Sequence, residues 1–238
     1  MRAVSSELQQ YMTGLTNEIS RGHFDEAVQL GEKALATEEL HGEGNESLLG
    51  EVYRNMAAAS DRLGRNDAAL RYIDQAYDIH DAVANANPAP DTLRERSATA
   101  SYVGVFALKT CLLADGCRDE ALADRARLMT RQAALDMAKV NQLSEEENAD
   151  QYEINMASRW GMIESIVGDK QRGLALAGRA IRLARQSERD QQKGLTGRDV
   201  LRARTRAVLR GMAAVAVNAA SRFGATRGMA EKIALKTL

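Results

Sequence analysis

The chain has 238 residues, of which 45% are hydrophobic and 27% are charged, and its formal net charge is −1. This apolar fraction is too high for a disordered protein, and the two prolines and two cysteines exclude collagen-like and disulfide-dense scaffolds. No apolar run approaches the roughly 18 residues that a transmembrane helix needs. Polar residues begin within the first seven positions and leave no apolar segment there, so we expect no secretory signal and a soluble, cytoplasmic protein.

Residue preferences favour helices throughout. Ala, Leu, Glu, Gln, Arg and Met dominate, and all of them favour helix, whereas no alternation of apolar and polar residues is sustained. Apolar residues recur at helical spacing, as at Leu174, Ala177, Ile181 and Ala184. The pattern predicts an all-α fold with helices over residues 5–20, 24–39, 45–63, 67–86, 92–114, 118–142, 145–167, 170–189, 199–223 and 227–237.

Short signals mark where these helices begin and end. Both prolines lie in residues 87–91, where Pro88 and Pro90 stop one helix and Asp91 is expected to cap the next. Glycines recur in the loops at positions 22, 64, 116, 168 and 224. Each is expected to adopt positive φ after a helix C-terminus. A small or apolar residue five positions later lies on the next helix, and where it is small it should allow close helix packing.

The loops divide the chain into helix pairs, which is the mark of a repeat architecture. The predicted pairs span approximately residues 5–39, 45–86, 92–142, 145–189 and 199–237. The pattern resembles the tetratricopeptide repeat (TPR) family, in a divergent variant with long helices. The resemblance is strong for Gly22 to Ala27 with Ala34, and for Ala57, Gly64, Ala69, Ile73 and Ala76. It is looser in the later units, where Lys109 and Met229 replace small residues.

The resemblance implies a single domain over residues 1–238, built as a right-handed solenoid of about five antiparallel helix pairs. In that family the first helix of each pair lines a concave face that binds a peptide or a partner helix. Positions at fixed distances before the loop glycines correspond to that face, and they include Phe106, Ser158 and Met162. The predicted peptide-binding groove contains Arg54, Asn55, Arg62, Asn155, Arg159, Asn218 and Arg222.

Asparagine suits such a groove because its amide both donates and accepts hydrogen bonds, and so can pair with a peptide backbone. The alternative is that these residues form an ordinary solvated helix face.

The near-zero net charge hides an asymmetry between the two parts of the chain. Residues 1–150 contain 15 Lys and Arg against 26 Asp and Glu, whereas residues 151–238 contain 17 against 7. Four arginines spaced by four residues form a predicted basic partner surface, the Arg ridge: Arg198, Arg202, Arg206 and Arg210. Its counterpart is an acidic protein, the acidic half of another copy, or phosphates, and plain solvated surface is the remaining alternative.

No motif points to catalysis. Cys111 and Cys117 lie six residues apart, which is not a metal or redox spacing, and we expect both to be buried or half-buried thiols. His23, His41 and His80 are scattered, and we place them at loops or helix ends. There is no glycine-rich phosphate loop and no nucleophile elbow. We therefore expect no enzyme activity, no cofactor and no metal.

The sequence favours a non-catalytic adaptor or scaffold that binds a protein or peptide, with an acidic partner as one option. Three alternatives stay open. The first is a structural protein that assembles by contacts between its acidic and basic halves, as a homo-oligomer. The second is a peptide-sensing regulator. The third is nucleic-acid binding through the Arg ridge, although no aromatic residue interleaves with those arginines.

Overall fold

The computed structural model describes residues 5–113, 119–143, 149–191 and 209, and this part of the chain is all-helical. It contains eight α-helices, one short 3-10 helix (η1) and no strand. The all-α prediction is therefore confirmed for the described residues. The helices are α1 (Ser6–Arg21), α2 (Phe24–Leu35), η1 (Glu38–His41), α3 (Glu46–Arg62), α4 (Asn66–Ala86), α5 (Pro90–Leu113), α6 (Glu120–Leu143), α7 (Ala149–Val167) and α8 (Lys170–Gln191).

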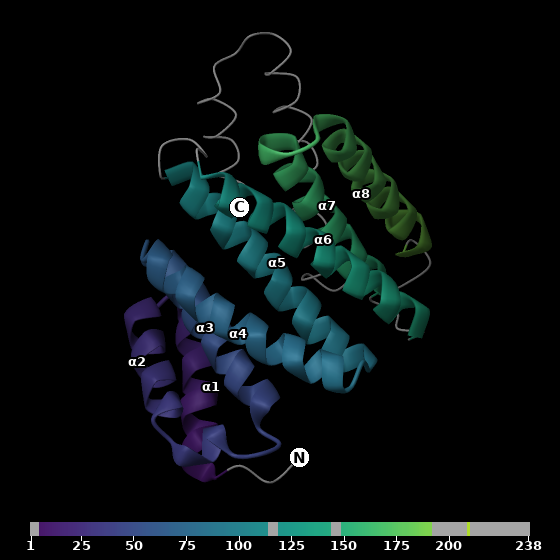
Figure 1. Ribbon diagram of the computed structural model, residues 1–238. Helices are drawn as coiled ribbons and strands as arrows, with labels where there is room; N and C mark the ends of the chain where they lie inside the picture. Colours follow the sequence, from purple (N-terminus) through teal and green to yellow (C-terminus); the bar gives the residue numbers. More distant parts are fainter. Residues whose placement is uncertain (1–4, 114–118, 144–148, 192–208, 210–238) are drawn as a thin grey trace.

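Each helix packs against the next one in the chain, so the molecule grows in one direction from α1 to α8 (Figure 1). The pairs α1/α2, α3/α4, α5/α6 and α7/α8 correspond to the first four predicted pairs. Smaller contacts join first helices of neighbouring pairs, α1 with α3 and α5 with α7. The fifth predicted pair, residues 199–237, lies outside the described residues apart from position 209.

The loop glycines act in two different ways. Gly22 and Gly64 adopt positive φ, at 85° and 73°, as predicted. The amide of Gly22 donates to the carbonyl of Ile19 at 3.1 Å and closes the end of α1. At Gly168 the prediction of positive φ is wrong. A side chain there would instead meet Arg127, whose Nε would lie 2.6 Å from an added Cβ. Gly168 therefore leaves space for the ends of the Arg127 and Glu164 side chains.

Two predicted helix ends differ from the structure. The second predicted helix runs to residue 39, but α2 ends at Leu35. Thr37 adopts an extended backbone conformation, and its hydroxyl donates to the Ala34 carbonyl at 2.7 Å. A 3-10 turn then places Leu40 in the core, fully buried.

The helix after the prolines begins at Pro90, not after Asp91. Proline suits the first helical position because it lacks the amide hydrogen that would have no partner there. Asp91 therefore lies in the first turn of α5, and the prediction that it caps this helix is wrong. The Thr92 hydroxyl, also in the first turn, accepts from the Ala89 amide at 3.1 Å.

Small residues set the helix spacing, as expected from the pattern. An added Cβ at Gly173 of α8 would lie 2.8 Å from the Ser165 amide and 2.9 Å from the Gly161 carbonyl of α7. Ala27 and Ala69, which follow the first two loop glycines by five residues, are almost fully buried. The core between the helices is built mainly from larger side chains, among them Leu8, Leu15, Met56, Ile73, Leu108 and Ile163.

Candidate functional site

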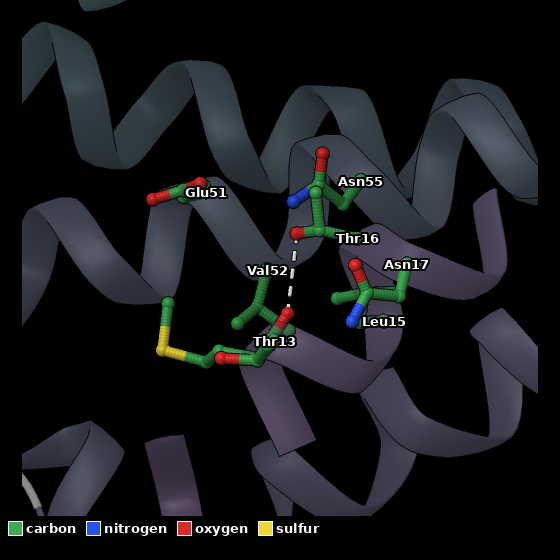
Figure 2. A pocket seen from close by; sticks show the side chains of 8 residues that line it. Thr13, Leu15, Thr16, Asn17, Glu51, Val52 and Asn55 are labelled. Carbon is green, nitrogen blue, oxygen red and sulfur yellow. Dashed lines mark hydrogen bonds between the residues drawn. The ribbon is translucent and has the colours of Figure 1, made fainter. Parts of the chain in front are cut away.

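A cleft of about 320 Å³ lies between α1 and α3, the first helices of the first two pairs (Figure 2). It is lined from α1 by Met12, Thr13, Leu15, Thr16 and Asn17, and from α3 by Glu51, Val52 and Asn55. Figure 2 shows the amides of Asn17 and Asn55 near Thr16, with Glu51 one turn away along α3. The predicted groove residue Asn55 therefore lines a cleft on the first helices of two neighbouring pairs.

Local packing fixes the two walls of this cleft. The Ser5 hydroxyl accepts from the Leu8 amide at 3.3 Å and starts α1, whose Leu8 and Leu15 point into the core. Val52 and Met56 are the buried face of α3. Because Gly31 of α2 has no side chain, the Met56 side chain of α3 packs closely against the α2 backbone. The apolar face of each helix thus packs into the core, and the neighbouring polar residues line the cleft.

The polar side chains that line the cleft form few hydrogen bonds within the protein. The Thr16 hydroxyl donates to the Met12 carbonyl at 3.1 Å, within α1. Among the described residues, the side chains of Thr13, Asn17 and Asn55 make no hydrogen bond to protein atoms. An amide offers two donors and one acceptor oxygen, so Asn17 and Asn55 present hydrogen-bonding groups that only solvent or a ligand can use.

Two predicted groove arginines instead connect first helices of neighbouring pairs. Arg54 of α3 forms an ion pair with Glu95 of α5, and its side chain is only 18% exposed. Arg159 of α7 donates to the Ser101 hydroxyl of α5 at 2.6 Å, and its guanidinium carbon lies 5.1 Å from the centre of the Tyr102 ring. A third contact of this kind joins Lys109 of α5 to Asp61 of α3 at 2.6 Å. These side chains already have partners within the fold.

The remaining groove predictions have mixed outcomes. Arg62 is exposed at the end of α3, and Asn155 is half-buried on α7. Phe106, Ser158 and Met162 are buried, so the prediction that they face an open groove is wrong. Phe106 belongs to the core between α4 and α5, and Met162 packs with Ala177 of α8. Two groove residues and the Arg ridge lie outside the described residues: Asn218, Arg222, Arg198, Arg202, Arg206 and Arg210.

Sequence reasoning missed the α1 wall of the cleft. Thr13 and Thr16 lie nine and six residues before Gly22, which are the same distances that place Asn55 and Ala58 before Gly64. Applying that register to the first loop glycine would have found both threonines. Asn17 lies outside the register, so its position depends on how α1 packs against α3.

A buried ionic cluster joins the middle helices. Arg96 of α5 donates from Nε and Nη2 to the two carboxylate oxygens of Asp136 on α6, each at 2.8 Å. Its remaining nitrogen donates to Asp81 at 2.9 Å and to Asn85 at 2.8 Å, both on α4. The hydrogen bonds to Asp136 raise the pKa of Arg96 above its usual value. The cluster connects three helices through one guanidinium group shared between two carboxylates, so it has one negative charge in excess.

The histidine prediction needs one correction. His80 is 2% exposed and lies inside α4, not at a loop or helix end. Its Nδ1 lies 2.8 Å from the Thr99 hydroxyl, and Gly50 of α3 leaves room for the ring. Burial lowers the pKa of His80, and the nearby Arg54 charge lowers it further.

Of the two cysteines, Cys111 lies within the described residues. Cys111 is buried, as expected, and its thiol donates to the Asp119 carbonyl at 3.6 Å. Cys117 lies outside the described residues.

Within the described part of the chain, no group of three or more His, Cys, Asp or Glu residues is arranged to hold a metal ion. None of the helices described is both long and apolar enough to span a membrane. The chain matches no protein-family model, and it matches no curated protein.

Proposed function

We propose that the chain is a non-catalytic adaptor of the TPR-like solenoid type, and that it binds an extended peptide segment of a partner protein between α1 and α3. The observation that supports this is the pair of accessible amides, Asn17 and Asn55, on opposite walls of one cleft. The cleft lies on the first helices of the first two pairs, which the resemblance to the TPR family assigns to the ligand-binding face.

The chemistry of the cleft favours a peptide over a small molecule. An extended peptide presents one amide donor and one carbonyl acceptor per residue, and an asparagine side chain can pair with both. The volume of the cleft, about 320 Å³, is at the lower end of the roughly 300–1,000 Å³ typical of ligand pockets. It therefore suits one part of a longer segment that continues along the helices.

The lining also indicates what the peptide contains. Met12, which is half-buried, offers an apolar contact, and Glu51 is the single ionisable group among the lining residues. A carboxylate favours a cation within about 4–6 Å. We therefore expect an apolar side chain over Met12, followed by a Lys or Arg near Glu51.

The test is selection of short random peptides on the purified full-length chain, followed by binding measurements on a blocked cleft. Asn17→Trp places a large ring in the cleft from an exposed position. Gln29→Trp, at an exposed site on α2, is the matched control. Selected peptides should bind Asn17→Trp about tenfold or more weakly and Gln29→Trp normally, with the difference measured by fluorescence anisotropy. Failure to select any peptide, or equal binding to both variants, would contradict the proposal.

A further inference from the structure

A second cleft lies on the other described pairs, between the side of α6 and the turn from α7 to α8. Its volume is about 490 Å³, and four arginines, Arg125, Arg127, Arg131 and Arg172, line it together with Leu128 and Glu164. None of these residues belongs to the cleft between α1 and α3, so this surface is independent of the proposed function.

The arginines are not equally neutralised. Arg125 forms an ion pair with Asp74 of α4. Arg127 contacts Asp124 at 3.1 Å and Glu164 at 3.3 Å. Arg172 reaches Glu164 only at 3.7 Å and therefore shares that carboxylate with Arg127. Arg131 is exposed and forms no ion pair with any described residue. Arg131 is thus the cleft arginine without an ion pair among the described residues, whereas Arg172 shares Glu164 with Arg127 and also lies near the Asp169 carboxylate.

Glu164 holds this arrangement in place. Its side chain is only 3% exposed, although it lies beside a basic cleft. It accepts hydrogen bonds from Trp160 Nε1 at 3.1 Å and from the Asp169 amide at 2.9 Å, in addition to its arginine contacts. Gly168 leaves the space in which Glu164 and Arg127 meet. A site whose charged groups are fixed before binding loses less conformational freedom when a ligand arrives.

The surface beside the cleft is apolar. Leu128 is 60% exposed and Leu135 is 47% exposed. They are seven residues apart on α6, so they share one face of the helix, and the exposed Arg131 lies between them in sequence. Exposed leucines next to an unneutralised arginine are typical of a surface that binds a partner with apolar and acidic groups together.

From this geometry we propose that the α6 cleft binds an acidic peptide segment of a partner protein. The segment places a carboxylate against Arg131 and Arg172 and an apolar side chain against Leu128. Arginine suits this role because its planar fork donates two parallel hydrogen bonds to one carboxylate. A nucleic acid fits less well because no aromatic ring lines the cleft for base stacking and the leucines would contact charged backbone.

The experiment selects short peptides rich in Asp, Glu, Leu and Phe on the full-length chain and measures binding by fluorescence anisotropy. Each selected peptide is compared with a copy containing Gln and Asn for its acids. We expect Arg131→Glu and Leu128→Ser each to weaken binding about tenfold or more. Arg71→Glu, at an exposed site on α4, is the matched charge control and should change it about twofold or less. Circular dichroism establishes that each variant is folded.

Four results would overturn the proposal. The first is that no acidic peptide is selected, or that the uncharged copies bind equally well. The second is equal weakening by Arg71→Glu and Arg131→Glu, which would show a general effect of charge that is not specific to this cleft. The third is displacement of the peptide by RNA together with no effect of Leu128→Ser, which would assign the cleft to phosphate. The fourth is self-association that Arg131→Glu abolishes in sedimentation, which would assign it to a second copy.

Discussion

The first two helix pairs, α1 to α4, and the next two, α5 to α8, are held together by different means. Most of the first core is apolar, with Leu8, Leu15, Leu40 and Met56 fully or almost fully buried. The core around α5 to α8 includes fully buried polar and charged groups, among them Ser97, Ser101, Asp136 and Ser158. Burying such groups requires partners for all of them, and that requirement fixes the helices in one arrangement.

This difference determines where a groove can open. Between α1 and α3 the apolar core seals the inner faces and leaves polar residues at an open cleft. Along α5 and α7 the corresponding residues Phe106, Ser158 and Met162 are buried. Arg159 of α7 contacts Ser101 and Tyr102 of α5. Helix pairs of similar sequence pattern therefore have different accessible faces. The first helices α1 and α3 leave a cleft open, whereas the long helix α5 packs closely against its neighbours and leaves none at the corresponding positions.

The largest expected effect comes from breaking the ionic cluster of the later pairs. Asp136→Ala removes the partner that holds two nitrogens of the buried Arg96, and losing one member of a buried pair costs about 3–5 kcal/mol. The control Asp124→Ala removes a carboxylate that is 76% exposed, and it should cost about 1 kcal/mol or less. Urea unfolding measures both. Equal losses would mean that the cluster does not stabilise these helices.

The next effect tests close helix packing in the α7/α8 pair. Gly173→Ala places a methyl group 2.8 Å from the Ser165 amide and should destabilise the protein by about 1–3 kcal/mol. Gly178→Ala lies on the same helix with only Arg182 within reach, at 3.5 Å, so it should stabilise the protein by about 0.5–1 kcal/mol. Thermal unfolding of the two variants should therefore shift in opposite directions. Shifts in the same direction would contradict the packing described.

The boundary between the two regions contains a pH-sensitive residue, His80. Burial, and then the Arg54 charge, lower its pKa, whereas Glu95 and the Ser47 carbonyl oppose them. The unfolded chain therefore takes up a proton at His80 more readily than the folded one, and stability falls as the pH falls through the unperturbed value of 6.5. His80→Gln should reduce the loss of unfolding free energy between neutral and mildly acidic pH. An unchanged slope would show that His80 titrates alike in both states.

The smallest effect concerns the ion pair that crosses between the regions, Arg54 with Glu95. Glu95 is 41% exposed, so a double-mutant cycle with Arg54→Ala and Glu95→Ala should give a coupling of about 0.2–1 kcal/mol. A coupling near zero would free Arg54 for the ligand role predicted from its position in the sequence, and would extend the proposed groove from α3 toward α5.

The helices could be predicted because their signals are local. Gly22 and Gly64 end helices within the residues that surround them, and the spacing of apolar residues marks the buried faces. The partners of Arg54 and Arg159 could not be predicted, because they lie 41 and 58 residues away along the chain. The same holds for His80, whose burial depends on Gly50 in another helix. Asn55 was found because it follows the repeat register, and Asn17 was missed because it does not.

The central claim is that an extended peptide binds between α1 and α3, and NMR spectroscopy of the ¹⁵N-labelled full-length chain tests it most directly. A peptide selected on the protein is titrated into the sample while amide chemical shifts are followed. The account predicts that the largest changes cluster at Thr13, Asn17, Glu51 and Asn55, and that Asn17→Trp removes them. Changes centred on α5 to α8, or changes that persist in Asn17→Trp, would contradict it.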